Sequence, residues 1–368
     1  MKILYVAPKF DYGIRERGFS FEHYNFFDTL FNMGNEIVYF DYIDILKKIG
    51  QTRMNNLLLE TFEKEKPELM FVFLFEYELD PKIISRISNS GKVITINWFA
   101  DDHWRFDNYS RYWAPYFNWV VTTDFEAVPK YHSLGIQKVI LSQWACNHFL
   151  YKNLRLEASY DVSFMGQAYG NRREIIKSVE TAGIPVLVRG QGWKSGRTTQ
   201  DQMIEIINRS RINLNIANAS VKYTSGLVKT FDKYALYNPI LKRVWRKVRS
   251  LIPSGSSKSQ PIFQIKGRNF EVPGCGGFFL TDYVKGLEEF YLPDEEIVCY
   301  RSTTELIEKI HYYLRHEELR NRIASNGFRA TMEKHTYVHR FNHLFNKMGL
   351  ECVYSLVQKV GQVIDVSV

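Results

Sequence analysis

Short apolar runs alternate with longer helical or polar stretches along the first half of the chain. We predict strands at Lys2–Ala7, Glu36–Asp41, Leu69–Phe75, Val93–Phe99, Trp119–Thr123 and Lys138–Gln143. Between them the pattern predicts helices at Phe21–Met33, Met54–Glu65, Pro81–Asn89 and Ala127–Leu134. This alternation is typical of βαβ units, and the strands are apolar on both faces, as a parallel sheet requires.

The same alternation begins again after a loop at residues 151–160. The second set of predicted strands is Asp161–Gly166, Pro185–Arg189, Arg211–Ile216, Gly277–Thr281 and Glu296–Tyr300. Its helices are expected at Arg172–Ala182, Gln200–Asn208, Asn269–Cys275 and Thr304–His316. We therefore predict an α/β fold of two Rossmann-like domains facing a cleft, at residues 1–155 and 156–335. A helical tail, 336–368, should cross back to the first domain.

The cleft between two such domains is where a ligand is expected, because open parallel sheets bind ligands beyond the carboxyl ends of their strands. The first βα turn, Ala7–Gly13, lacks the G-x-G-x-x-G pattern of nicotinamide-binding dehydrogenases. The chain also has no G-x-x-x-x-G-K-[ST] loop, which argues against P-loop chemistry.

The positive charge of the chain is concentrated in one segment. The net charge is +8, but nine of the 48 Lys and Arg residues lie between Lys233 and Arg268, where no acidic residue occurs. The rest of the chain has 39 basic residues against 40 acidic ones. Nucleic-acid binding would favour a larger basic face, so we do not expect it.

The apolar runs and the cysteines indicate a cytoplasmic protein. The longest apolar run, Leu69–Phe75, is far shorter than the ~20 residues of a membrane-spanning helix, and the first residues do not form a signal peptide. The four cysteines are scattered without C-x-x-C spacing, which argues against a disulfide framework and a zinc site.

The segment from Gln264 to Asp282, QIKGRNFEVPGCGGFFLTD, is the most informative part of the chain. It resembles the nucleotide-binding signature of GT-B glycosyltransferases, most closely that of the CgeB-like (spore maturation protein) branch. The likeness extends over residues 286–314. The resemblance implies that Glu271 accepts hydrogen bonds from the donor ribose, since a carboxylate suits a vicinal diol. The alternative is a first-turn charge that the helix dipole stabilises.

The same resemblance implies further residues of a donor site. Lys266 and Arg268 would neutralise the diphosphate; the alternative is that they are solvated surface charges. Gly276 and Gly277 would allow the backbone to approach the donor closely, or they simply serve the turn. The stretch 161–174 is similar to the first βα unit of the donor domain. There Gly166, Arg172 and Arg173 would meet a phosphate. The loop 188–193, with Gly190 and Gly192, is similar to the loop that borders the nucleobase, or is an ordinary turn. Phe263 stands where many retaining relatives have a second glutamate.

The first domain offers its own candidates directly after the fourth predicted strand. Asp101, Asp102 and His103 are expected at the cleft, where a carboxylate or imidazole could help an acceptor hydroxyl to attack. Alternatively, Asp101 caps the following helix. We assign no metal here. His335, His339 and His343 share one helical stripe, which without an accompanying carboxylate we interpret as solvated or packed. His148 is either near the donor or a packing residue.

The long connection at about 218–262 is an insertion. Asn238–Ile252 predicts a basic amphipathic helix, which favours contact with an anionic membrane surface or a partner, or packing on its own domain. The residues that we expect at a membrane are Leu241, Arg243, Trp245, Arg246, Lys247 and Val248.

The resemblance as a whole implies a metal-independent glycosyltransferase that needs no cofactor. It would move a sugar from a nucleotide-diphosphate sugar, held by the second domain, to a glycan, lipid-linked or surface-polymer acceptor on the first, as in cell-surface polysaccharide biosynthesis. Two alternatives stay open: a nucleotide-sugar epimerase or hydrolase on the same fold, and a non-catalytic cell-surface or spore-coat assembly protein.

Overall fold

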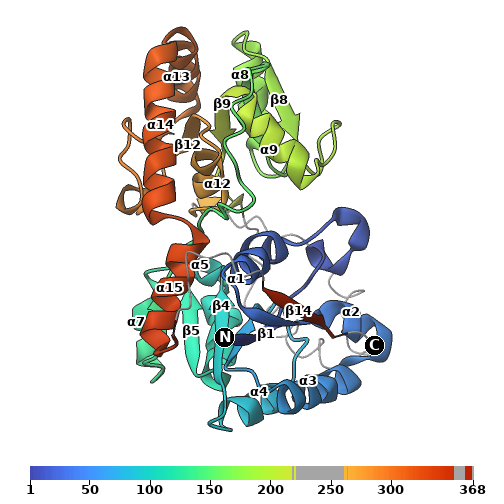
Figure 1. Cartoon of the computed structure of the whole chain (residues 1–368). Coiled ribbons are helices and arrows are strands. Elements are labelled where there is room, and N and C mark those ends of the chain that lie inside the picture. Colours follow the sequence, from blue (N-terminus) through green and yellow to red (C-terminus); the bar gives the residue numbers. More distant parts are fainter. Residues whose placement is uncertain (218, 221–260, 263, 352–360, 367–368) are drawn as a thin grey trace, which may run out of the picture.

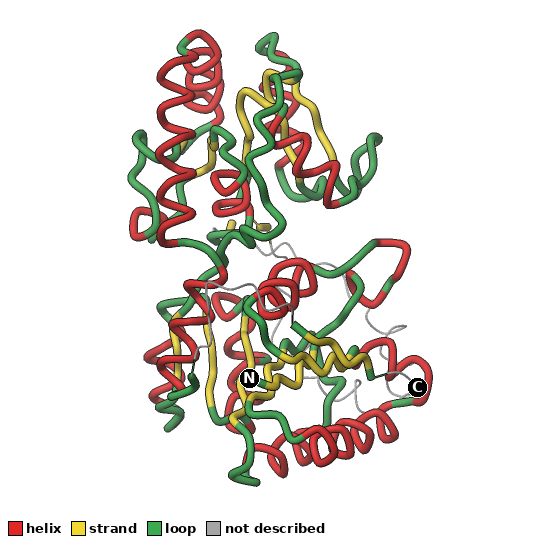
Figure 2. The backbone as a smooth tube through the Cα atoms, in the orientation of Figure 1, coloured by secondary structure: helices red, strands yellow, loops and turns green. Residues whose placement is uncertain are grey.

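The computed structural model describes residues 1–217, 219–220, 261–262, 264–351 and 361–366. Two α/β domains are stacked one above the other, and Figures 1 and 2 show helices around a sheet in each of them. The insertion helix expected at 238–252, with its six membrane-facing residues, lies outside the described residues. The short strands β10 (Ala219–Ser220) and β11 (Pro261–Ile262) pair antiparallel, so the two ends of the insertion lie side by side.

The N-terminal domain is built on one seven-stranded sheet whose strands all run parallel. In spatial order these strands are β14 (Gln362–Asp365), β2 (Glu36–Phe40), β1 (Lys2–Val6), β3 (Leu69–Val72), β4 (Ile94–Phe99), β5 (Trp119–Thr122) and β6 (Val139–Leu141). The helices are α1 (Asp28–Asn32), α2 (Tyr42–Ile49), α3 (Gln51–Glu65), α4 (Pro81–Ser88), α5 (Asp102–Arg105), α6 (Ser110–Trp113) and α7 (Ala127–Ser133). A π-helical turn, His23–Phe27, precedes α1.

The C-terminal domain has a parallel sheet of five strands. Their order is β13 (Val298–Tyr300), β12 (Phe279–Asp282), β9 (Ser210–Asn215), β7 (Tyr160–Met165) and β8 (Val186–Arg189). The helices are α8 (Arg172–Thr181), α9 (Gln200–Asn208), α12 (Arg268–Gly274), α13 (Thr303–Arg315) and α14 (Glu317–Lys334). The fold class, two Rossmann-like domains with parallel sheets, is therefore as the sequence predicts.

Within the described residues the chain passes between the domains after β6 and again after α14, and these two crossings are bonded to each other. The first crossing follows β6, and the second joins α14 to α15 (Tyr337–Met348). Cys146 N–H donates to the His335 carbonyl at 2.9 Å, and Tyr337 N–H donates to the Cys146 carbonyl at 3.0 Å. α15 then packs on the first domain, where the Phe341 ring lies 5.9 Å from the Phe71 ring. One continuous apolar core therefore joins the domains at this junction.

The last described segment corrects the expectation of a helical tail to the end of the chain. α15 is a helix, but Gln362–Asp365 is strand β14, which pairs with β2 at the edge of the N-terminal sheet. The adjacent residues Val363 and Ile364 are β-branched, which favours an extended backbone. The edge of a parallel sheet offers such a segment an unpaired row of backbone groups.

Candidate active site

The cleft lies between the carboxyl ends of the two sheets, and loops of both domains touch across it. Arg197, after β8, pairs with Asp11, in the first βα turn, at 2.7 Å. The Gln264 amide donates to the Ala100 carbonyl, at the end of β4, at 3.0 Å. The first contact joins the loop after β8 to the N-terminal domain, and the second joins the segment before α12 to it.

Lys266 is a desolvated cation in this cleft. Its ammonium donates to the Gln264 side chain. Burial lowers the pKa of Lys266; the Arg172 charge lowers it further, and the Asp101 charge raises it. Lys266 therefore lies within electrostatic reach of an arginine in its own domain and a carboxylate in the other.

Arg172, at the start of α8, is held in place by backbone acceptors. Its guanidinium donates to the carbonyls of Gln167 at 3.1 Å and of Ile216 at 2.6 Å, and it lies over the Tyr169 ring at 4.9 Å. Burial lowers the pKa of Arg172, and its Nε is buried without a hydrogen-bond partner. Among the described residues no carboxylate lies within ion-pair distance of Arg172 or Lys266. The two cations thus form a positive site suited to an anion.

Arg268 and Glu271 form a second charged group on α12. Their side chains make a salt bridge one turn apart, and the Glu271 side chain is 2% exposed against 27% for Arg268. Burial alone would lower the pKa of Arg268, but the Glu271 carboxylate outweighs it and raises that pKa. Burial, and then the Glu271 charge, raise the pKa of Tyr151. Arg268 is thus directed to Glu271, whereas Lys266 and Arg172 are left for an anion.

The loops after β7 and β8 lock together around glycines. Gly190 has φ +139°, and a Cβ there would lie 2.1 Å from the Gly166 carbonyl oxygen. The Trp193 indole donates to the same oxygen at 2.8 Å. Arg173 lies over the Trp193 ring at 5.0 Å and donates to the Gly192 carbonyl. Arg173 is therefore bonded to this loop, and the structure does not place it beside the anion site with Arg172.

Gly276 and Gly277 lie at the opposite end of strand β12 from the cleft. They precede Phe279, where the strand begins, whereas its carboxyl end is Asp282. A Cβ on Gly276, which has φ +73°, would lie 2.5 Å from the Asn153 side chain, and one on Gly277 would lie 2.8 Å from Asn213. Gly276 and Gly277 therefore serve close packing in the turn between α12 and β12 and do not lie at the cleft, where the donor contact was expected.

Asp101, Asp102 and His103 point in different directions, because they start the one-turn helix α5. The Asp102 side chain enters the core: it is 1% exposed and accepts a 2.8 Å hydrogen bond from the Tyr131 hydroxyl. Burial raises the pKa of Asp102 to about 6. Asp102 is therefore a structural group and not part of the cleft, contrary to expectation. The Asp101 carboxylate accepts from the Gln264 amide at 3.5 Å, across the domain boundary.

His103 is a neutral imidazole at this boundary. Burial lowers the pKa of His103 to about 4, and the Lys266 charge lowers it further while the Asp101 charge opposes the shift. A neutral imidazole has one nitrogen free to accept a proton. His103 can therefore act as a base toward a hydroxyl group that reaches it.

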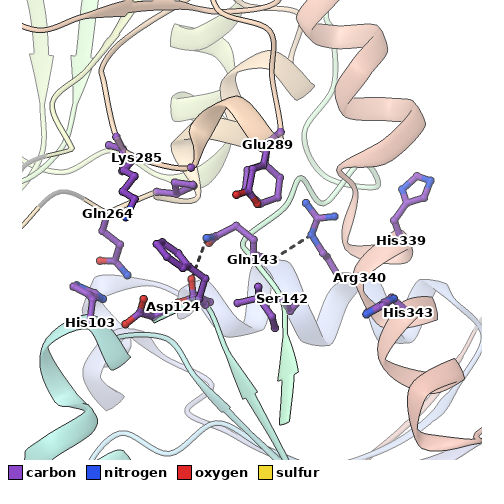
Figure 3. A pocket seen from close by; sticks show the side chains of 17 residues that line it. His103, Asp124, Ser142, Gln143, Gln264, Lys285, Glu289, His339, Arg340 and His343 are labelled. Carbon is purple, nitrogen blue, oxygen red and sulfur yellow. Dashed lines mark hydrogen bonds between the residues drawn. The ribbon is translucent and has the colours of Figure 1, made fainter. Parts of the chain in front are cut away.

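A cavity of about 440 Å³ opens next to His103 and Gln264 (Figure 3). Its walls come from α5, from the loop after β5, from the end of β6 and the loop after it, from the segment before α12, from the loop after β12 and from α15. Besides His103 and Gln264, the lining side chains include Thr123, Asp124, Phe125, Leu141, Ser142, Gln143, Ile265, Val284, Lys285, Glu289, Phe290, His339, Arg340 and His343. Of these residues the sequence analysis assigned only His103 to the reaction, because they come from six distant segments.

The remaining histidine candidates have separate surroundings. His335 is bonded to the Phe290 carbonyl at 2.6 Å, and His339 takes part in the cap of α15 with Thr336 at 2.7 Å. His339 and His343 both line the cavity. His148 packs against the Phe149 ring at 4.1 Å. Within the part of the chain that the structure describes, no group of three or more metal-ligating side chains occurs.

Comparisons with known proteins agree with this architecture. Residues 254–346 match the family described as glycosyl transferase-like. The spore protein CgeB of Bacillus subtilis (strain 168) is 22% identical over 221 residues, and that match covers 59% of this chain and 64% of CgeB, so the chain spans less than two thirds of that relative.

Solved structures are similar at lower identity. HepE of Anabaena in complex with UDP-glucose has a TM-score of 0.57 at 11% identity, over 95% of this chain and 99% of that one. Sucrose-phosphate synthase of Thermosynechococcus elongatus has a TM-score of 0.55 at 9% identity, again over 95% and 99%. These likenesses establish the GT-B fold.

Proposed function

We propose that this GT-B protein, a relative of CgeB, is a glycosyltransferase that moves a hexosyl group from a nucleoside-diphosphate sugar to a hydroxyl of a glycan, lipid-linked or surface-polymer acceptor. The observation that carries the proposal is the pair Lys266 and Arg172. Both are desolvated cations, Arg172 at the start of α8 after β7 and Lys266 just before α12, and among the described residues neither has a carboxylate partner in ion-pair contact. A diphosphate supplies the missing negative charge.

The reaction follows from the residues on the two sides of the cleft. The acceptor oxygen forms a bond to the anomeric carbon of the donor sugar as the bond from that carbon to the diphosphate oxygen breaks. The proton of the acceptor hydroxyl passes to the imidazole of His103, and the electron pair of the broken bond stays on the diphosphate. Lys266 and Arg172 stabilise this charge in a desolvated site, the role that a metal ion has in other transferases. We propose that no metal is required, so EDTA should leave turnover unchanged.

A matched pair of variants tests the anion site. Arg172→Gln should weaken binding of UDP at least tenfold, because hydrogen bonds to charged groups contribute ~1.5–3 kcal/mol. Arg173→Gln, at the next position, should change it less than twofold, since Arg173 is bonded to the Gly192 loop. Isothermal titration calorimetry with UDP, GDP and ADP measures both effects and identifies the preferred base. Equal losses in the two variants, or no binding of any nucleotide by the wild type, would remove the proposed donor site.

The location of the acceptor depends on the insertion. We propose that Asn238–Ile252 holds the protein reversibly on the inner face of an anionic membrane, because each basic residue near such a surface contributes about 1 kcal/mol. In the part of the chain that the structure describes, no helix has the length and apolar character to cross a bilayer. Vesicle sedimentation at low ionic strength tests the contact, with Trp245→Glu as the variant expected to stay in the supernatant. If that variant sediments as well as the wild type, this helix does not dock on membranes.

A further inference from the structure

The cavity in Figure 3 has two chemically different ends. His103 and Gln264 lie at one end, beside the proposed donor cleft, whereas His339, Arg340 and His343 project from α15 at the other. At about 440 Å³ the cavity is within the range of ~300–1,000 Å³ that ligand pockets occupy. A molecule that fills it would thus have one end at the proposed base.

The α15 end of the cavity holds one permanent cation, Arg340, beside His339 and His343, whose pKa values burial lowers. Arg340 is fixed by neutral acceptors: its Nε donates to the Gln143 carbonyl, and its Nη atoms lie against the Lys334 carbonyl and the His335 ring, each at 3.3 Å. Among the described residues no carboxylate lies within ion-pair distance of this guanidinium. Burial lowers the pKa of Arg340, because its charge is poorly solvated there.

The acidic side chains of the cavity do not neutralise this end. Asp124 accepts a hydrogen bond from the Glu126 N–H at 3.0 Å, and in Figure 3 it lies near His103. Glu289 is exposed. Phe125 is 48% exposed, and the Lys285 ammonium lies over its ring at 4.8 Å, so the other face of the ring is the one that could meet an apolar surface such as that of a sugar ring.

We infer that this cavity is the acceptor pocket, and that the acceptor is a sugar or polyol bearing a carboxylate or a phosphate, which Arg340 and His343 bind while a hydroxyl lies at His103. The inference rests on the proposed function, since it assigns the acceptor side of that reaction. An anionic group at Arg340 gives the guanidinium the charged partner that it lacks. The separation of the two ends then selects acceptors whose anionic group and reactive hydroxyl lie at opposite ends of the molecule.

Saturation-transfer NMR titrations in the presence of saturating UDP test this assignment. The probes are methyl glucoside, methyl glucuronide and methyl glucoside 6-phosphate, which differ only in having no charge, a carboxylate or a phosphate. The wild type should bind one or both anionic probes at least tenfold more tightly than the neutral one. The anionic probe that binds more tightly shows whether the site prefers a carboxylate or a phosphate. Equal binding of all three probes would overturn the inference.

Two variants locate the binding. His343→Glu places a negative charge at the α15 end through an exposed side chain. It should weaken binding of the anionic probes at least fivefold and change binding of the neutral probe less than twofold. Arg340→Gln should abolish the preference. His316→Glu, an exposed histidine of the other domain, is the matched control and should have no effect. Because Arg340 also bonds the domain junction, His343→Glu decides the outcome if Arg340→Gln is unfolded. Undiminished anionic binding in His343→Glu would refute the assignment.

Calorimetry with UDP on the same variants separates this inference from the proposed function. The affinity for UDP should stay within twofold of the wild type in His343→Glu, because that residue lines the cavity and not the donor site. A protein that binds none of UDP, GDP and ADP but still prefers the anionic probes would contradict the proposed donor site while leaving the anion-binding cavity in place. Normal UDP binding without that preference would contradict this inference alone.

Discussion

Replacement of Glu271 by Gln tests both charged functions of α12 at once. The substitution keeps the shape of the side chain but removes its charge, so the Arg268 guanidinium is left without its partner. Loss of one member of a buried ion pair costs ~3–5 kcal/mol. Because the Arg268 side chain is 27% exposed, water can solvate part of its charge, and we expect a loss of about 2–3 kcal/mol in the free energy of unfolding.

Urea unfolding of four variants, Glu271→Gln, Arg268→Met, the double variant and a control, measures this loss. Glu271→Gln should lower the midpoint, and Arg268→Met/Glu271→Gln should be less destabilised than the sum of its two single changes, because no uncompensated charge remains in it. Glu318→Gln, at an exposed position of α14, is the control. If the effects of the single changes simply add up, the two side chains are not coupled and the argument fails.

Calorimetry on the same protein tests the second function of Glu271. If its carboxylate also accepts hydrogen bonds from the ribose, Glu271→Gln should weaken UDP binding by ~1–3 kcal/mol. An unchanged affinity for UDP would restrict Glu271 to its structural pairing with Arg268.

Three further changes test other parts of the site. His103→Ala should lower kcat ~100-fold with UDP affinity within twofold, measured by donor turnover; full activity would remove the proposed base. Gly190→Ala should lower the melting temperature, since its Cβ would collide with the Gly166 carbonyl; an unchanged value would contradict the packed loop. Burial lowers the pKa of His335 from 6.5 to about 4, so its contribution to stability is complete above pH 6.5 and is lost as the pH falls toward 4. In urea unfolding, His335→Gln should reduce the fall in the free energy of unfolding between pH 6.5 and 5 by about 1 kcal/mol per pH unit on average, and an unchanged slope would contradict that.

The parallel sheets could be predicted because burial on both faces leaves a clear mark in the sequence. Runs such as Leu69–Phe75 are apolar throughout, although the strand itself ends at Val72. Helix α2 was missed, although the sequence contains signals for it: Asp41 caps it, and Tyr42, Ile45 and Ile49 have helical spacing. The helix expected at Gln362–Asp365 was wrong for a different reason. This segment forms a strand because it pairs with the free edge of β2, a tertiary contact that the local sequence does not encode.

The direction of individual side chains could not be predicted. Arg172 and Arg173 are neighbours in sequence, yet one faces backbone acceptors at the cleft and the other packs on Trp193. Asp101 and Asp102 diverge in the same way, because successive residues of a helix point in different directions. The pairing of Arg268 with Glu271 was accessible from the sequence, since residues three apart on a helix are neighbours. The cavity was not, because it depends on how two domains and α15 meet.

The charges across the cleft give the reaction an order. Before a nucleotide is present, the strongest attraction on Lys266 is that of Asp101, on the opposite domain, while Arg172 repels it. A diphosphate at Lys266 and Arg172 brings two or more negative charges to the same place and removes the repulsion between the cations. In the proposed reaction its negative charge also offsets the Lys266 charge, which adds to burial in lowering the pKa of His103. We therefore expect donor binding to make His103 a stronger base, so that the acceptor is activated only after the nucleotide sugar has bound.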